Sequence, residues 1–331
     1  MNIVQIVDSK GKRRVGLVAG DKIILLKKVT RTTELATLAL KEGVKLMKAA
    51  SALATAATED YAGALKERRV LTPVDHEDPA HCMIAGTGLT HLGSASARDS
   101  MHAKLDGKIT ELSDSLKMFK MGLEGGKPAK GHTGVQPEWF YKGDGSWLVP
   151  PGGALSKPSF ARDGGEEPEL AGLYMIDAEG KPVRLGFALG NEYSDHVTER
   201  QNYLFLAHSK LRHCSIGPEM IAGHAPSHIE GMSRINRGGK TIWQKPFLTG
   251  EANMSHTIAN LEYHHFKYAG FRRPGDVHIH FFGTATLSIA DGIVPLDGDE
   301  FEISAPVFGA PLRNRLKDLK PDFKIGSVKS I

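Results

Sequence analysis

The chain has 331 residues, of which 40% are hydrophobic and 24% are charged, a composition typical of a globular protein with a sizeable core. Its 42 basic and 38 acidic residues leave a formal net charge of +4, and no long block of one sign occurs. This bias is too weak to indicate nucleic-acid binding, and we expect no nucleic-acid partner.

No apolar run is long enough to cross a bilayer, and the N-terminus lacks the apolar run of a signal peptide. The two cysteines, Cys82 and Cys214, stand in no CxxC arrangement, so they predict neither a disulfide framework nor a zinc knuckle. We therefore expect a cytoplasmic protein without a membrane partner.

The first 75 residues predict a small α/β domain. Three short apolar runs separated by turn compositions are typical of strands, at 2–7, 13–19 and 22–26. From Thr33 to about Arg69 the chain is rich in Ala, Leu, Lys and Glu with leucines at helical spacings, which predicts one or two amphipathic helices. The two prolines of "VLTPVDHEDPAH" then end the helix, so we place a domain boundary near residue 75.

Residues 76–331 predict a mainly β catalytic domain, because short apolar runs alternate with Gly, Pro, Asp and Asn. We expect strands within "HCMIAGTG", "PEWFYKG", "ELAGLYMID", "RLGFALGNE", "DVHIHFFGTATLSI" and "EFEISAPVFG". Residues 104–134 are polar and, toward their end, Gly-rich, which is more typical of a mobile flap over a site than of packed core.

Two acids stand at the head of the apolar run "EEPELAGLYMI". Glu167 and Glu169 are two residues apart and would project from the same face of a strand, and a hairpin through "DAEGKP" would bring Glu192 beside them. Three converging carboxylates repel each other unless a cation neutralises them, and an all-oxygen site suits Mg²⁺, Mn²⁺ or Ca²⁺. The alternative, which spacing alone favours, is that these acids lie at a solvated strand end and have no function.

The order of the motifs resembles the fumarylacetoacetate hydrolase superfamily over roughly residues 80–316: "EPEL", "GNEYS", "GPEM", "PGD", "FFGT", "LDGDEFEI" and "FGAPLRN". The resemblance implies an α+β, mainly β fold, with a mixed β-sandwich roll behind the small N-terminal domain, and a homodimer. It also implies one Mg²⁺ or Mn²⁺ held by Glu167, Glu169 and Glu192. Glu192 stands where the family usually has Asp, and the longer side chain keeps the same class of ligand.

Two motifs depart from the family. In its hydrolases a His and a Glu three residues later activate water; here His91 keeps the position of the His, but Ser94 replaces the Glu. A base for water would lose the carboxylate that orients it, which disfavours hydrolysis of a carbon–carbon bond. The family's lysine is displaced by two residues, and we assign its role to Lys210, with His208 in the nominal position.

The complete motif set resembles the branch that includes bacterial 2-keto-3-deoxy sugar acid (pentonate) dehydratases. It implies a metal-dependent hydro-lyase of sugar acid catabolism that converts a small-molecule 2-keto acid into a semialdehyde. The metal would acidify C3 of the substrate, a neutral Lys210 in a desolvated pocket would remove the proton, and His91 would protonate the leaving C4 hydroxyl. Two alternatives stay open: a hydrolase or decarboxylase of acylpyruvate-type keto acids, and a non-catalytic small-molecule-binding protein.

Five further residues are candidates for substrate binding. Lys142 matches a strand lysine of the family and could hold the substrate carboxylate, and Asn191 belongs to the "GNEYS" motif. Gly283 and Thr284 match the family's Gly-Thr, whose hydroxyl and backbone N–H groups could bind the keto acid. Arg98 could reach the site from a flap. The structural alternatives are a snorkelling lysine, a strand-end turn and a surface charge.

The histidines offer a second metal hypothesis. His278 and His280 lie two residues apart on one strand face, with His264 and His265 nearby in the sequence, and such a pair is a signal for zinc or iron. No third ligand stands at short spacing, so we prefer the carboxylate site and interpret these residues as buried, hydrogen-bonded histidines.

Overall fold

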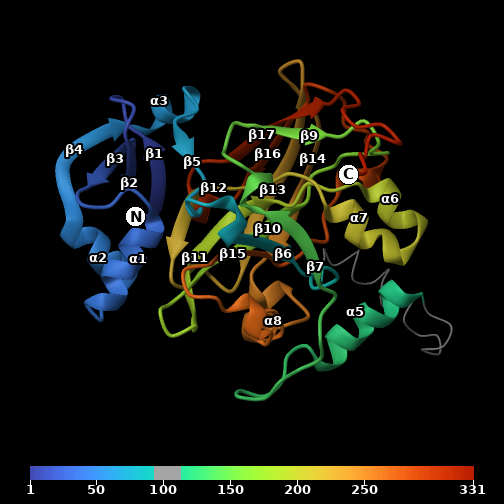
Figure 1. Cartoon of the computed structure of the whole chain (residues 1–331), viewed down its shortest axis with the longest axis horizontal. Coiled ribbons are helices and arrows are strands. Elements are labelled where there is room, and N and C mark those ends of the chain that lie inside the picture. The colour runs from blue at the N-terminus through green and yellow to red at the C-terminus, as the bar shows by residue number, and fades with distance from the viewer. Residues whose placement is uncertain (93–112) are drawn as a thin grey trace.

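The computed structural model describes residues 1–92 and 113–331, in which two β-sheets form the body of the molecule (Figure 1). The first three strands lie where the sequence predicts them and pair as an antiparallel meander: β1 (Ile3–Val7), β2 (Arg13–Ala19) and β3 (Lys22–Leu26). Two helices follow, α1 (Thr32–Lys41) and α2 (Leu46–Leu53). Their buried side chains, such as Leu35 and Ala50, join the same core as Ile3 and Leu17.

The prediction of helix up to residue 69 is wrong over one segment. Strand β4 (Ala54–Asp60) follows α2 directly and pairs with the open edge of β3, with Lys22 opposite Asp60. Alanine-rich sequence favours a helix locally, but here the edge of β3 offers hydrogen bonds to the whole segment, and tertiary pairing overrides the propensity. A short helix α3 (Tyr61–Lys66) and strand β5 (Val70–Leu71) complete this part.

The centre of the molecule is built from strands that come from distant parts of the sequence: β6 (Cys82–Gly86), β7 (Phe140–Asp144), β8 (Leu148–Val149), β10 (Pro168–Ile176), β11 (Pro182–Asn191), β12 (Cys214–Ala222) and β15 (Val277–Phe281). They join the N-terminal strands in one 12-stranded sheet with the main order β4-β3-β2-β1-β12-β11-β10-β15-β6-β7. The link is the antiparallel pairing of β1 with β12, Ile3 opposite Met220. The two-domain division near residue 75 stays a prediction.

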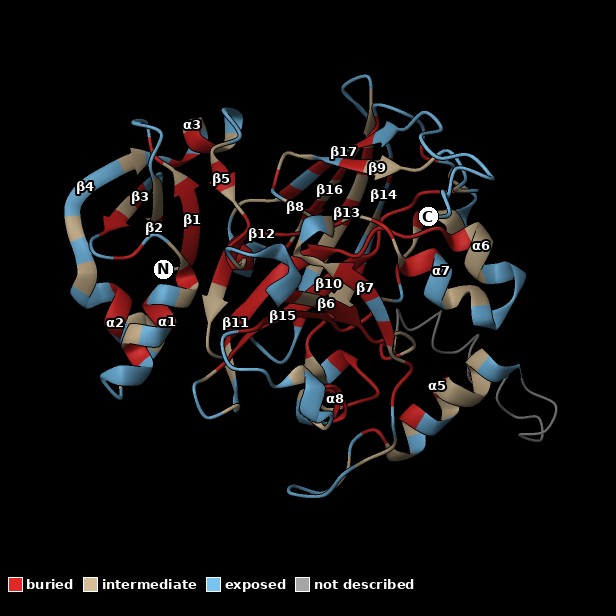
Figure 2. Cartoon of the chain, viewed as in Figure 1, coloured by how far each residue is buried: buried red, intermediate tan, exposed pale blue. Residues whose placement is uncertain are grey.

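A second sheet of five strands packs against this centre, in the order β14 (Lys240–Thr249), β13 (Ile229–Arg237), β16 (Glu300–Ser304), β17 (Leu312–Asp318) and β9 (Ala154–Lys157). Strand β10 lies in the most buried region, as the red centre of Figure 2 shows. Leu170 and Tyr174 pack into one hydrophobic cluster, whereas Ala171 and Leu173 pack into another. Both faces of β10 are therefore covered, which explains its almost unbroken apolar sequence.

Four further α-helices follow α1 to α3 in the described residues: α5 (Asp114–Gly125), α6 (His196–Gln201), α7 (Leu206–Lys210) and α8 (Ile258–Phe266). Helix α5 occupies part of the predicted flap, and its Phe119 is buried against Leu89 and Leu92. Residues 104–112 of that flap are outside the described range. Both cysteines are buried and free. None of the helices described is long and apolar enough to span a membrane.

Candidate metal centre and active site

The hairpin of β10 and β11 brings the three proposed metal ligands together. Glu169 lies opposite Gly190, and Glu167 and Glu192 flank the open end of the hairpin, where the N–H of Glu192 donates to the carbonyl of Glu167. One carboxylate oxygen from each of the three acids lies within 4.8 Å of the others. All three side chains are buried, so the alternative of three solvated acids is excluded.

Two lysines supply positive charge to these acids. The Nζ atom of Lys210 lies 2.5 Å from Oε1 of Glu167 and 2.9 Å from Oε2 of Glu192. The Nζ atom of Lys142 lies 2.6 Å from Oε1 of Glu192. Glu169 instead accepts a hydrogen bond of 2.7 Å from the backbone N–H of Gly283. Glu169 is therefore the carboxylate of the trio without a cationic partner among the described residues.

The pKa shifts reflect this imbalance. Burial raises the pKa of Glu169 well above its usual range, and the charges of Glu192 and Glu167 raise it further. Burial also opposes the charge of Glu167, but Lys210 and His196 outweigh it and hold the pKa of this carboxyl below its usual range. Within the trio, Glu167 is thus held in its ionised form. Glu169 favours its protonated form until more positive charge is present.

A hard divalent cation fits this arrangement. The donor atoms are carboxylate oxygens, which Mg²⁺ and Mn²⁺ prefer, and they are held close together away from solvent. Such an ion would supply positive charge in contact with Glu169, which here accepts only the N–H of Gly283. Glu167, Glu169 and Glu192 are the residues that would hold it.

Lys210 differs from the sequence-based expectation of a neutral amine. Burial alone would lower its pKa, but Glu167, Glu192 and Glu199 outweigh burial and raise the pKa well above the usual value. The residue is therefore an ammonium in this structure. Its Nζ atom also lies 5.0 Å from the centre of the Phe140 ring, and this cation–π contact further stabilises the charged head group.

All three N–H groups of the Lys142 ammonium contact oxygen atoms of the protein. Besides Glu192 it donates to the carbonyls of Tyr193, at 2.5 Å, and of Lys210, at 3.0 Å, and its side chain is fully buried. An ammonium has three N–H groups, so none is left over here. Lys142 positions Glu192 in this structure, and its contact with a substrate carboxylate stays a prediction.

The remaining proposed substrate ligands lie around the trio. The side-chain carbonyl of Asn191 accepts a hydrogen bond of 3.3 Å from the N–H of Glu167, while its Nδ2 atom is buried without a partner in the described residues. Gly283, with φ of +90°, binds Glu169 through its N–H, and the hydroxyl of Thr284 accepts from the N–H of Thr286 at 3.2 Å. Arg98 and Ser94 fall outside the described residues.

His91 lies beside Gly283, the residue whose N–H binds Glu169. A side chain at Gly283 would collide with Thr90 and come 3.5 Å from Nδ1 of His91, so glycine is required for this close packing. The ring makes contacts of 3.0 Å to Oγ1 of Thr249 and 3.2 Å to Oγ1 of Thr90. Burial lowers its pKa to about 4. His91 is therefore neutral at pH 7 and has no extra proton to donate.

Glu138 is a functional candidate that the sequence analysis does not identify. It precedes Phe140 on the segment that enters β7, and burial raises its pKa to about 7, against the opposing effects of Tyr203 and Lys210. Gly88 makes room for it, because any side chain there would collide with its carboxyl group. A single Glu in "PEWFYKG" has no spacing that marks it, so only the folded chain reveals its position.

His196 is a second candidate that sequence reasoning misses. Its ring nitrogens lie 3.1 Å from Oε1 of Glu167 and 3.4 Å from Oδ2 of Asp163. Burial would lower the pKa of His196, but these two carboxylates outweigh it and raise the pKa to about 10. A charged His196 thus holds Glu167 in its ionised form. Its position directly after "GNEYSD" is the signal that could have found it.

The histidine cluster has the character of packed core. The Nε2 atom of His265 lies 2.9 Å from Nδ1 of His278, Trp139 donates to His265 at 3.2 Å, and His264 contacts the carbonyl of Gly134 at 3.0 Å. Both ring nitrogens of His280 lack a partner in the described residues. Burial lowers the pKa of His278 to about 4 and that of His280 to about 3. Within the described ranges only the acidic trio has metal-ligand geometry.

Comparison with known proteins identifies the fold. No family model and no curated protein matches the chain. Among solved structures, the apo form of a 2-keto-3-deoxy-D-arabinonate dehydratase superposes with a TM-score of 0.70 at 20% identity, over 97% of this chain and all of the other. The chain has the fold of this dehydratase. The predicted α+β, mainly β fold is thereby confirmed.

Two further structures share the fold. One is the same dehydratase complexed with magnesium and 2,5-dioxopentanoate, with a TM-score of 0.69 at 20% identity, covering 97% of this chain and all of the other. The other is 5-carboxymethyl-2-hydroxymuconate delta-isomerase from Mycobacterium smegmatis, with a TM-score of 0.58 at 15% identity, covering 96% of this chain and all of the other. Dehydratases and isomerases thus occur on this fold, and the choice of reaction depends on the site.

Proposed function

We propose that the protein is a divalent-metal-dependent hydro-lyase of the fumarylacetoacetate hydrolase superfamily that removes water from a 2-keto-3-deoxy sugar acid, such as a pentonate. The observation that carries this proposal is the buried trio of Glu167, Glu169 and Glu192, in which Glu169 has no cation in contact and the other two acids bind Lys210. Its support is the shared fold with a dehydratase whose structure contains magnesium and 2,5-dioxopentanoate.

When held by the trio, Mg²⁺ or Mn²⁺ supplies Lewis-acid chemistry that draws electron density from the C1 and C2 oxygens of a 2-keto acid and so acidifies the C3 protons. The ammonium of Lys210 adds to this effect, because it can donate a hydrogen bond to the oxygen at C2 as negative charge develops there. Lys210 thus takes an electrostatic role in place of the base predicted from sequence.

Glu138 is suited to moving the proton. Because its pKa is about 7, both its protonated and its ionised forms are populated at neutral pH. As a carboxylate it accepts a proton from C3, and as a carboxylic acid it returns a proton to the C4 hydroxyl, which leaves as water. The unsaturated keto acid then reaches the semialdehyde by tautomerisation, without a further change in composition.

The other charged residues position these groups. His196 keeps Glu167 ionised, and Lys142 holds Glu192 through a contact of 2.6 Å. Both are buried, so neither is free to exchange partners with bulk water. Their contribution is to fix the carboxylates before substrate arrives, which lowers the cost of assembling the site.

The alternative is a hydrolase of acylpyruvate-type keto acids, and product analysis separates the two. The purified protein is incubated with Mg²⁺ or Mn²⁺ and a panel of 2-keto-3-deoxypentonates and acylpyruvates, and the products are followed by mass spectrometry. We expect the loss of one water from a pentonate, abolished by EDTA and restored by added metal. Cleavage of an acylpyruvate into pyruvate and an acid would instead establish the hydrolase. The expected homodimer and cytoplasmic location stay predictions, and sedimentation and cell fractionation check them.

A further inference from the structure

A cleft separate from the acidic trio lies between the N-terminal helices and the central sheet. Its volume is about 490 Å³, within the range of small-molecule sites. One wall comes from α1, α2 and the turn that joins them, and the other from the start of β11 and the end of β12. It shares no lining residue with the proposed active site, so its occupancy does not depend on the proposed reaction.

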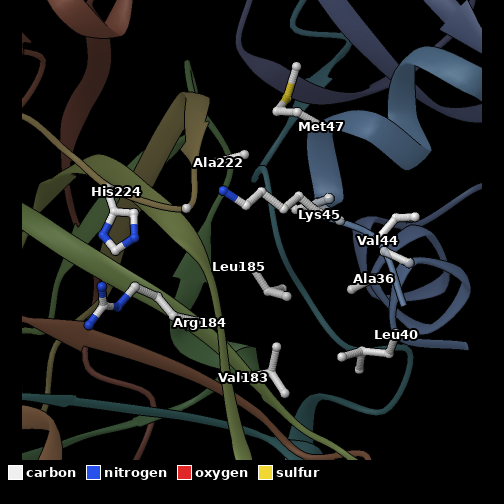
Figure 3. A pocket seen from close by; sticks show the side chains of 13 residues that line it. Ala36, Leu40, Val44, Lys45, Met47, Val183, Arg184, Leu185, Ala222 and His224 are labelled. Atoms are coloured by element: carbon white, nitrogen blue, oxygen red, sulfur yellow. The ribbon is translucent and has the colours of Figure 1, made fainter. Parts of the chain in front are cut away.

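The body of the cleft is apolar. Figure 3 shows Val183 and Leu185 of β11 facing Ala36, Leu40 and the neighbouring residues of the helical wall. Leu185 is a buried member of the main hydrophobic core, and Val183 is partly buried and packs against that core. An apolar chain of several methylene groups placed here would lose its contact with water, and each buried methylene stabilises binding.

One end of the cleft is cationic. The side chain of Lys45 reaches across from the residue before α2 toward Ala222 and His224 (Figure 3). Arg184 at the same end binds Glu262 through two contacts of 2.6 Å, so its charge is neutralised. Lys45 and His224 are exposed, and the ion pairs of the described residues include neither of them. A ligand with a negatively charged head would find an uncommitted ammonium there.

We propose that this cleft binds a monocarboxylate with an apolar tail of medium length, its tail between α1 and β11 and its carboxylate at Lys45. The charge complementarity decides the class of ligand: an apolar floor with one uncommitted ammonium at its end matches one acidic head on a hydrocarbon chain. A ligand without a charge would leave Lys45 unpaired, and a cationic amphiphile would be repelled by it.

The test is isothermal titration of the intact protein with decanoate below its micellar concentration, with decyltrimethylammonium as the probe of opposite charge. We expect saturable binding of one decanoate per chain and no saturable binding of decyltrimethylammonium. Lys45→Glu reverses the charge at the rim and should weaken decanoate binding by roughly tenfold, the value of a partly exposed charged hydrogen bond. Lys48→Glu makes the same change on α2 outside the cleft and should leave the affinity unaltered.

A second variant tests the cavity itself. Val44→Trp places an indole in the turn that forms part of the helical wall, and it should abolish decanoate binding while the melting temperature stays close to that of the parent. Equal decanoate affinity in Lys45→Glu and Lys48→Glu would overturn the proposal, as would the absence of saturable binding. A dimer in sedimentation that Val44→Trp dissociates would assign the cleft to a second copy of the chain and would also overturn it.

Discussion

The burial of His280 in strand β15 should make the free energy of unfolding depend on pH, so that the folded protein is less stable in acid. Its side chain is 1% exposed, and burial lowers its pKa to about 3. The unfolded chain binds the proton near pH 6.5, roughly the value of an unperturbed histidine. A folded-state pKa below the unfolded one means that this group's contribution to stability is present above about pH 6.5 and is lost as the pH falls toward 3.

The size of the effect follows from the linkage relation. At about pH 5 the folded protein keeps His280 neutral while the unfolded chain is protonated, and a difference of roughly 1.5 pH units at about 1.36 kcal/mol each amounts to about 2 kcal/mol. The variant His280→Leu lacks this group. On going from about pH 8 to about pH 5, the variant should therefore lose about 2 kcal/mol less of its free energy of unfolding than the parent does.

The measurement is urea unfolding at several pH values, followed by tryptophan fluorescence, for the parent and for His280→Leu. The difference between the two free energies of unfolding is taken at each pH, so that contributions from other titrating groups cancel. His132→Leu, at an exposed position, serves as the control variant. If the parent and His280→Leu follow parallel curves over this pH range, then burial does not keep His280 neutral and the reasoning fails.

Three further predictions concern the proposed active site. Glu169→Gln should abolish both activity and Mg²⁺ binding measured by calorimetry, while the circular dichroism spectrum is retained. Glu230→Gln, at an exposed position, is the control. Equal metal binding by the two variants would contradict the trio as the metal site. Lys142→Ala should lower the free energy of unfolding by about 3–5 kcal/mol, because it breaks a buried ion pair and leaves Oε1 of Glu192 without its cation, while Lys210 contacts only Oε2; a loss within the range of surface substitutions would refute that role. Glu138→Gln should lower kcat by roughly 10²–10⁴-fold and remove the ionisation near pH 7 from the pH–rate profile. An unchanged profile would assign proton transfer to another group.

The local features of the chain are readable from its sequence. Strands β1 to β3 follow from short apolar runs between turn residues, since both the side-chain period and the turn chemistry are set by neighbouring residues. The convergence of Glu167, Glu169 and Glu192 follows from alternation along one strand and from a hairpin return. The motif order then implies the fold that the solved structures confirm.

What the sequence leaves undecided depends on groups that are far apart in the chain. The segment 54–60 becomes a strand because β3 offers it an open edge. Lys210 is charged because it packs between Glu167 and Glu192, whereas burial alone predicts a neutral amine. Glu138 acquires its raised pKa from burial, in a position that the missing side chain of Gly88 leaves free. Residue propensities and motif spacing depend on neighbouring residues in the sequence. Edge pairing, desolvation and the balance of buried charge arise only when distant segments meet, so the tertiary structure alone decides them.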